Sequence, residues 1–339
     1  MKVGIDISQA VYGTGVSDYV INLVQHLPQS ELVLFGFSLR RKSDITTPFP
    51  SAKTFLIPPT FLDIIWNRLH ILPAETLIGP VDILHSSDWT QPPTQAKKVT
   101  TIHDLAPFIY PQETSPNIVA VQTRRMKWVV KECDQIICVS QNTANDLKLR
   151  FKVQESRIKV VYEALPTRYQ LKPQITKYTN YILAIGARQP RKNIQRLITA
   201  CRELKLKLII VGEPPSTLPL SSSPALIYTG YVTDQDLVNY LAGTSAFVYP
   251  SLYEGFGLPI LGAFYHGAPV ACSNTSSLPE VAGDAAAYFD PLSVESIAAG
   301  ITQAIADRDR LVAAGTKQLA KFSWAKTAQQ TLDVYKSIC

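Results

Sequence analysis

Short apolar runs alternate with longer amphipathic stretches along the whole chain, and this alternation predicts strands and helices in regular succession. In the first half, the runs that indicate strands cover residues 3–7, 32–37, 54–57, 83–85, 99–103, 135–139 and 159–161. Helical periodicity covers residues 18–27, 117–132 and 142–151. Strands that alternate with helices are typical of parallel sheets joined by right-handed crossovers.

The second half of the chain restarts the same rhythm. Apolar runs cover residues 181–185, 208–211, 226–228, 246–249, 270–272 and 287–289, and a helical stretch follows each of them. A chain of 339 residues exceeds what one core comfortably holds, so two doubly wound α/β domains are predicted. We expect an N-terminal domain at 1–166, a polar linker at 167–180, a second domain at 181–322 and a closing amphipathic helix at 323–339.

The composition is that of a globular protein in a reducing compartment. Hydrophobic residues make up 46% of the chain and charged residues 18%, which excludes a disordered chain. The five cysteines have neither disulfide nor metal spacing, and most lie in apolar patterns, which indicates buried reduced thiols. The segment MKVGIDIS is a strand rather than a leader, and no apolar run approaches the ~20 residues that cross a bilayer. These features predict a soluble, cytoplasmic protein.

The net charge of +6 is mild, but basic residues concentrate in one stretch. Between residues 168 and 207, ten Lys and Arg residues are opposed by a single acid, Glu203. This imbalance favours an anion-binding site, although part of the charge is that of ordinary solvated helix faces. The stretch lacks interleaved aromatics and any helix-turn-helix or zinc pattern, so nucleic acid is not an expected partner.

The most informative segment spans residues 251–286, where a strand end, a glycine-rich elbow and a helix start follow one another. The elbow consists of Glu254, Gly255, Phe256, Gly257 and Leu258. A glycine shortly before a proline at a first helical position predicts a helix N-terminus beside the acid. The unpaired N–H groups and the positive dipole end there suit a phosphate or a hydroxyl-rich ligand. A carboxylate that only stabilises its own helix, by about 0.3–1 kcal/mol, is the alternative.

This segment resembles the donor-site signature of the retaining glycosyltransferases of family 4, in which two acids separated by seven residues hold a nucleotide sugar. Glu254 matches the first acid, whereas Gly262 stands at the position of the second. The resemblance covers nearly the whole chain and implies the α/β GT-B fold, in which two Rossmann-like domains face a cleft and the C-terminal helix crosses back to the first domain. Gly262 leaves three interpretations open: natural divergence with another group serving the ribose, an impaired protein, or a deliberate substitution.

Three further motifs fit the family pattern. Gly13 and Gly15 form a loop after the first strand that the family places beside the acceptor and the donor phosphates; a purely structural turn is the alternative. His103 ends an apolar strand, and the matching histidine in the family bonds the donor sugar near its reactive carbon; a satisfied structural donor is the alternative. Relatives hold the base through backbone groups at the positions of Gly230, Tyr231 and Val232.

A basic segment opens the first helix of the second domain. Family members carry an Arg directly after a glycine and a Lys six positions past that glycine. Lys192 matches the Lys, but Ala187 stands at the Arg position, so Arg188 or Arg191 is expected to take its place. Positive charge opposes the dipole at a helix N-terminus, and this unfavourable placement indicates a bound anion.

The resemblance implies a retaining, metal-independent transfer of a hexosyl unit from a nucleotide-diphosphate sugar to a hydroxyl of a glycan, a lipid-linked sugar or a small molecule. In this interpretation Lys192, with Arg188 or Arg191, neutralises the leaving diphosphate, while His103 and Glu254 position the sugar. The alternative is a catalytically impaired sugar-nucleotide-binding or scaffold protein of the same fold, which Gly262 supports. A sugar-nucleotide epimerase fits residues 251–286 less well.

Neither a metal nor a cofactor is expected. The acidic pairs Asp234-x-Asp236 and Asp307-x-Asp309 lie at predicted helix starts, where they are typical of caps rather than metal ligands. A basic helix with an apolar side at residues 124–131 suggests weak peripheral contact with the inner face of a membrane, and inward packing of that helix is the alternative.

Overall fold

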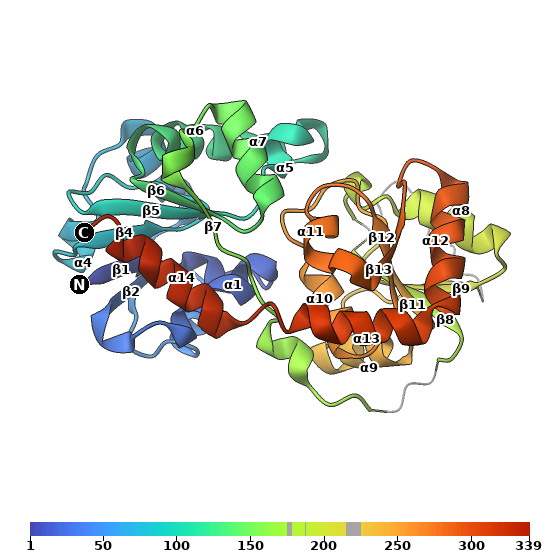
Figure 1. Cartoon of the computed structure of the whole chain (residues 1–339). Coiled ribbons are helices and arrows are strands. Elements are labelled where there is room, and N and C mark those ends of the chain that lie inside the picture. The colour runs from blue at the N-terminus through green and yellow to red at the C-terminus, as the bar shows by residue number, and fades with distance from the viewer. Residues whose placement is uncertain (175–177, 187, 215–224) are drawn as a thin grey trace. The chain divides into compact units, whose positions relative to one another are not determined.

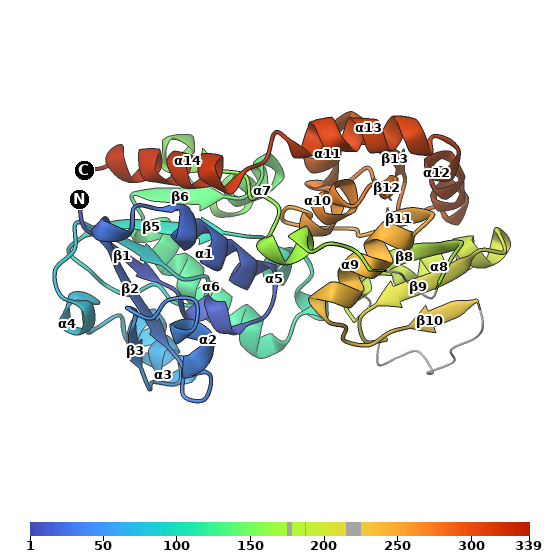
Figure 2. The ribbon, with the colours of Figure 1, turned by 90° about the horizontal axis from the view of Figure 1, so that it is seen from below.

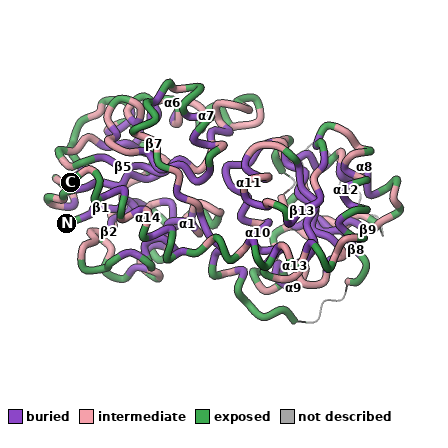
Figure 3. Tube along the Cα trace, in the orientation of Figure 1, coloured by how far each residue is buried: buried purple, intermediate pink, exposed green. Residues whose placement is uncertain are grey.

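The computed structural model describes residues 1–174, 178–186, 188–214 and 225–339. It divides into two compact units (Figure 1). The first consists of Met1–Glu163 together with Trp324–Cys339, and the second of Ala164–Ser323. Each unit has its own sheet, and the central strands of both sheets are deeply buried (Figure 3).

The first unit contains a seven-stranded, wholly parallel sheet. Its strands are β1 (Val3–Asp6), β2 (Leu32–Phe37), β3 (Lys53–Phe55), β4 (Ile83–Ser86), β5 (Lys97–Ile102), β6 (Gln135–Cys138) and β7 (Ile158–Val160). They lie in the order β3-β2-β1-β4-β5-β6-β7, so the chain winds outward from β1 in both directions. Each strand predicted from an apolar run is present within two residues of its predicted bounds, because parallel strands covered on both faces are continuously apolar.

Helices cover both faces of this sheet. They are α1 (Gly15–His26), α2 (Lys42–Thr46), α3 (Pro59–Leu62), the π-helix η3 (Asp63–Leu69), α4 (Glu75–Ile78), α5 (Ala106–Ile109), α6 (Pro116–Glu132), α7 (Gln141–Phe151) and α14 (Trp324–Lys336). Met126 of α6 and Leu147 of α7 belong to one apolar cluster with Ile102 and Ile136 of the sheet. Right-handed crossovers to the two sides of β1 lie on opposite faces, which places α1 on the face away from α6.

The closing helix α14 belongs to the first unit, as the predicted return of the chain requires. It packs against α1 (Figures 1 and 2). The hydroxyl of Tyr335 lies 2.6 Å from Nδ1 of His85 on β4. Thr327 donates its hydroxyl to the carbonyl of Tyr162 just after β7, at 2.7 Å. Two hydrogen bonds, of which that to His85 is buried, therefore hold α14 to segments that precede it by more than 150 residues.

The second unit repeats the architecture with a six-stranded parallel sheet in the order β10-β9-β8-β11-β12-β13. Its strands are β8 (Tyr181–Ile185), β9 (Lys207–Val211), β10 (Leu226–Tyr228), β11 (Ala246–Tyr249), β12 (Val270–Ser273) and β13 (Ala286–Phe289). Its helices are α8 (Ile194–Glu203), α9 (Asp234–Gly243), α10 (Leu258–Tyr265), α11 (Leu278–Ala282), α12 (Val294–Ala306) and α13 (Arg308–Leu319). All six predicted strands of this half are present.

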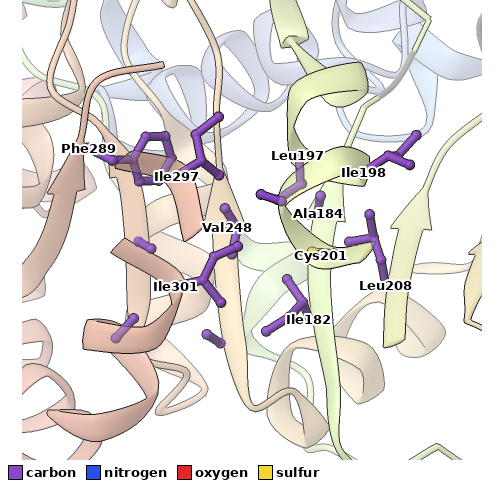
Figure 4. Close-up of a cluster of buried hydrophobic side chains, with 14 of the residues drawn as sticks. Ile182, Ala184, Leu197, Ile198, Cys201, Leu208, Val248, Phe289, Ile297 and Ile301 are labelled. Carbon is purple, nitrogen blue, oxygen red and sulfur yellow. The ribbon is translucent and has the colours of Figure 1, made fainter. Parts of the chain in front are cut away.

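The core of the second unit lies where α8 and α12 cover one face of its sheet (Figure 4). Leu197 of α8 and Ile301 of α12 point toward Ile182 of β8 and Val248 of β11, and all four side chains are fully buried. The prediction of buried, unpaired thiols is confirmed for four cysteines, Cys133, Cys138, Cys201 and Cys272. The fifth, Cys339, is exposed.

The predicted linker at 167–180 differs from what the structure shows. The chain passes from the first unit to the second between Glu163 and Ala164, and the 3-10 helix η6 (Thr167–Gln170) is part of the second unit. Tyr169 is buried there, and its carbonyl accepts a hydrogen bond of 2.7 Å from Nε2 of His266. A large buried ring outweighs the polar composition of the segment. Residues 175–177 of the predicted linker lie outside the described residues.

Candidate functional site

The candidate residues of the second unit follow the carboxyl ends of its strands. Gly186 follows β8, Gly230 follows β10, and the elbow with Glu254 follows β11. Because the sheet is wholly parallel, these loops emerge at one edge, which is where doubly wound folds bind ligands.

Glu254 lies between two cations. Its Oε1 atom is 2.6 Å from Nζ of Lys192, and its Oε2 atom is 3.3 Å from a guanidinium nitrogen of Arg191. Lys192 also donates to the hydroxyl of Tyr249 at 2.9 Å, and Arg191 donates to the carbonyl of Tyr253 at 2.7 Å. The two cations exceed the one carboxylate by a single positive charge, so the cluster can attract an anion.

This cluster is buried enough for its charges to act strongly. The side chains of Lys192 and Arg191 are 16% and 12% exposed, and that of Glu254 is 10% exposed. Burial raises the pKa of Glu254, but the charges of Lys192 and Arg191 outweigh this and hold the pKa at about 2. Burial, reinforced by the charge of Glu254, raises the pKa of Tyr249 well above its ordinary value. The carboxylate is therefore ionised and the phenol neutral at pH 7.

The elbow is held in place by the loop after β12. Ser277 is fully buried and donates to the carbonyls of both Glu254 and Phe256, at 3.0 and 2.8 Å. Ser276 accepts a hydrogen bond of 3.0 Å from the Glu254 backbone N–H. Gly257 has φ of 119° at the N-cap of α10, a conformation that L side chains rarely adopt. The predicted helix start beside Glu254 is present, at Leu258.

A tyrosine ring occupies the space beside Gly262. A Cβ atom added to this glycine would lie 2.5 Å from Cδ1 and 2.6 Å from Cε1 of Tyr169, a separation that real Cβ atoms do not show. Tyr169 is 2% exposed, so its ring has little freedom to move away. A glutamate at position 262 therefore requires a different position for Tyr169, and the second acid of the family motif has no room in this structure.

The remaining candidates of this unit fall in different surroundings. Arg188 is exposed, and the described residues give it no ion pair, whereas Arg191 reaches Glu254. Ala187 lies outside the described residues. Gly230 has φ of 66° and accepts a backbone hydrogen bond of 3.1 Å from Gly212 after β9. Tyr231 beside it is 90% exposed and Val232 is half-buried, so this loop presents backbone and an open aromatic face.

In the first unit, His103 follows β5, and two residues contact its ring from different sides. Its Nδ1 atom lies 2.9 Å from Oε1 of Glu163, which follows β7. The ring of Tyr19 meets it edge-on, with ring centroids 4.7 Å apart. The neighbouring Asp104 accepts a hydrogen bond of 2.8 Å from the N–H of Ala106, the first residue of α5.

A pocket of about 440 Å³ opens beside His103. Tyr12 and Val16 from the glycine loop line it, so the structure brings this loop and His103 to one cavity. Asp88 and Arg125 add charge to its wall. Burial raises the pKa of Asp88, and the charge of Arg125 opposes this rise.

The glycine loop itself divides into a turn and a helix start. Gly13 has φ of 69°, and its N–H donates to the Ser17 hydroxyl at 2.9 Å. Gly15 is the first residue of α1, three residues earlier than the predicted start at Asp18. A Cβ atom at Gly13 would touch no other atom, so its conformation alone accounts for the glycine.

The basic helix at residues 124–131 packs inward. It is part of α6, where Arg125, Met126 and Val129 are buried and Arg124 pairs with Asp63 at 2.6 Å. The apolar side expected to meet a membrane is thus part of the core. None of the helices in the described part of the chain combines the length and the apolar character needed to span a bilayer.

Comparison with known proteins places the chain in a family. Residues 13–169 match the profile described as Glycosyltransferase Family 4, and residues 168–319 match that described as Glycosyl transferases group 1. O-antigen chain mannosyltransferase B of Escherichia coli is 34% identical over 281 residues, which cover 75% of this chain and 74% of that protein. The chain belongs to glycosyltransferase family 4.

Solved structures agree with this family 4 assignment at the level of the fold. Sucrose-phosphate synthase from Thermosynechococcus elongatus is similar with a TM-score of 0.74 and 18% identity, over 100% of this chain and 99% of that one. Anabaena HepE, solved in complex with UDP and glucose, is similar with a TM-score of 0.70 and 15% identity, over 99% and 100%. The expected GT-B class, with two Rossmann-like units, is confirmed.

Several residues around the candidate sites of the two units were absent from the sequence prediction. They are Glu163, Asp88, Tyr249, Tyr169, Ser276 and Ser277. Asp88 and Glu163 follow directly after strands β4 and β7, at the edge where His103 also lies. An acid within three residues of a parallel strand's carboxyl end was thus a usable signal. Tyr169 had no such signal, because its partner is 93 residues away in sequence.

Proposed function

We propose that this family 4 member is a retaining, metal-independent glycosyltransferase that moves a hexosyl unit from a nucleotide-diphosphate sugar to a hydroxyl of a glycan. The observation that supports this most is the buried cluster of Lys192, Arg191 and Glu254 beside the N-terminus of α10. Two fixed cations supply, without a metal ion, the charge that a departing diphosphate needs.

The chemistry proposed for the cluster is a front-face displacement. The bond between the sugar C1 and the diphosphate oxygen breaks, and a bond from C1 to the acceptor oxygen forms on the same face. The acceptor hydroxyl proton passes to the leaving diphosphate, so the products are a glycoside and a nucleoside diphosphate. Lys192 and Arg191 neutralise the diphosphate, and Glu254 and His103 hold the sugar hydroxyls.

The relatives favour a mannosyl donor and a polysaccharide acceptor. The E. coli protein at 34% identity is named as an O-antigen chain mannosyltransferase. In this chain, the pocket of about 440 Å³ in the first unit has a volume suited to a sugar residue, and it combines apolar walls with the charges of Asp88 and Arg125. We infer that it receives a terminal sugar of the growing glycan.

Turnover with a panel of GDP-, UDP- and ADP-sugars tests the proposal. Release of nucleoside diphosphate with retention of anomeric configuration, undiminished by EDTA, is the expected result. Lys192→Met, which keeps the length of the side chain but removes its charge, is the matched control and should lose this turnover. Binding of nucleoside diphosphate by calorimetry without turnover of any donor would instead indicate the impaired binding or scaffold protein that Gly262 suggests.

A further inference from the structure

The carboxylate of Glu163 is aimed at His103. Its Oε1 atom lies 2.9 Å from Nδ1 of the imidazole, and the residue is 4% exposed. His103 is the hydrogen-bond partner that the described residues give this carboxylate, and they give no partner for the other ring nitrogen, Nε2. His103 also lines the pocket beside the glycine loop, so Nε2 is the ring atom left for a ligand.

The backbone around Glu163 is fixed rather than loose. The carbonyl of the preceding Tyr162 accepts the hydroxyl of Thr327 on α14 at 2.7 Å. The following Ala164 is 1% exposed. The hydrogen bond at Tyr162 and the burial of Glu163 itself leave the carboxylate little freedom to turn away from His103.

The imidazole is held by packing as well. Tyr19 meets the ring edge-on, and the Tyr19 hydroxyl lies 3.0 Å from that of Thr101 on β5. The Thr101 hydroxyl also lies 3.0 Å from Nε2 of His85, whose other nitrogen meets Tyr335. Burial lowers the pKa of His85 to about 3, so this second histidine is neutral and serves the network as a hydrogen-bonding group. The hydrogen bond to Glu163 and the packing of Tyr19 thus both fix the position and the plane of the His103 ring.

A carboxylate accepts hydrogen bonds and cannot donate them when ionised. Opposite Glu163, Nδ1 of His103 must therefore carry the proton, and in the neutral ring Nε2 is then an acceptor. A ring held by packing alone would sample both tautomers and would offer an N–H from Nε2 part of the time. Carboxylates in this position decide the tautomer and the orientation of functional histidines in metal sites and in hydrolases.

We propose that Glu163 is a positioning residue of the glycosyltransferase, which holds His103 as the Nδ1-protonated tautomer so that Nε2 accepts a hydrogen bond from a hydroxyl of the donor sugar. This inference rests on the proposed function. It adds a residue that the family motifs did not point to, and it assigns to the sugar, rather than to the nucleotide, the interaction that the pair governs.

Steady-state kinetics of Glu163→Ala test the role. We expect kcat to fall by about ten- to a hundredfold, the range typical of lost orienting partners, while the dissociation constant for nucleoside diphosphate stays within twofold. Glu163→Gln, whose amide oxygen can still accept from Nδ1, should recover part of the loss. Asp63→Asn is the control: Asp63 is another buried acid of the first unit, paired with Arg124 and not among the residues that line the pocket.

A double variant separates positioning from general stability. If Glu163 acts only through His103, His103→Ala with Glu163→Ala should lose no more activity than His103→Ala alone. Losses that multiply, or a folded Glu163→Ala enzyme with wild-type kcat, would overturn the proposal. An equal loss of kcat in Asp63→Asn would mean that Glu163→Ala lowers activity by destabilising the first unit and not by releasing His103.

A spectroscopic measurement remains decisive if no donor is turned over, in which case the proposed function fails first. The ¹⁵N shifts of His103 in the wild-type chain should show a protonated Nδ1 and an unprotonated Nε2 when the ring is neutral. Glu163→Ala should yield a mixture of tautomers. The same tautomer in both proteins would show that Glu163 does not control the ring.

Discussion

At the scale of single residues, the basic side chains of the second unit differ in whether they reach Glu254. The family resemblance selected Lys192 and left Arg188 and Arg191 open as its partner. The structure brings Arg191 to within 3.3 Å of Glu254 and leaves Arg188 exposed. A lysine at a helix start is usually solvated, but the side chain of Lys192 is only 16% exposed.

The first prediction concerns these cations. Lys192→Ala and Arg191→Ala should each lower kcat by roughly a hundredfold or more, because each removes a preorganised charge from the leaving group. Arg188→Ala should have a smaller effect. Turnover measured beside Arg202→Ala, an exposed arginine at the end of α8, provides the baseline. If Arg188→Ala costs more than Arg191→Ala, the diphosphate lies elsewhere than beside Glu254.

The second prediction concerns pH. The folded pKa of Glu254, about 2, lies below its ordinary value of 4.5, so its ionised form stabilises the folded second unit. This contribution is complete above pH 4.5 and is lost as the pH falls from 4.5 to 2. Urea unfolding followed by far-UV circular dichroism should therefore show a destabilisation by Glu254→Gln at pH 7 that shrinks at pH 3. A difference that is constant with pH would mean that the ion pairs contribute nothing.

At the scale of elements, strands were predictable and several helices were not. Thirteen strands followed from apolar runs, because strands covered on both faces have few polar positions. The short helices between β3 and β4 were not predicted, since the π-helix η3 and four-residue turns such as α3 and α4 break the 3.6-residue period. Partners such as Glu163 for His103 depend on strand order, which one sequence does not reveal.

The third prediction concerns the contact of η6 with α10. Gly262→Ala should destabilise the second unit by about 1–3 kcal/mol, because overpacking against Tyr169 outweighs the roughly 1 kcal/mol that alanine gains in a helix. Gly262→Glu, which restores the second acid of the family motif, should fold poorly for the same reason. Chemical denaturation of both variants measures these effects.

The double variant Tyr169→Ala with Gly262→Glu examines the same contact from the other side. Removal of the ring makes room for the acid, so the double variant should be more stable than Gly262→Glu alone. It should also bind nucleoside diphosphate more tightly than Tyr169→Ala, if the acid then meets the ribose. If the double variant loses as much stability as Tyr169→Ala and Gly262→Glu lose together, the two positions do not interact and the proposed contact is wrong.

At the scale of the whole molecule, the tryptophans form a natural probe. All four, Trp66, Trp89, Trp128 and Trp324, belong to the first unit. Tryptophan emission therefore reports the first unit alone, whereas far-UV circular dichroism reports both units.

The fourth prediction uses this asymmetry. A nucleoside diphosphate at a hundred times its dissociation constant should stabilise the second unit by about 2.7 kcal/mol. The urea midpoint of the circular dichroism transition should rise, while the midpoint from tryptophan emission stays in place. A parallel rise of both midpoints would show that the two units unfold as one, or that the nucleotide binds the first unit as well.

The return of α14 to the first unit has a consequence for biosynthesis. The second unit, Ala164–Ser323, is inserted in sequence between two parts of the first. A growing chain therefore completes the second unit before it has made the helix that covers Tyr19 and bonds His85. The unit that is translated first is finished last, against the usual order in which domains leave the ribosome and fold from the N-terminus. A chain that stops before Trp324 carries an intact second unit beside an uncovered face of α1, which gives chaperones and proteases a means to recognise it.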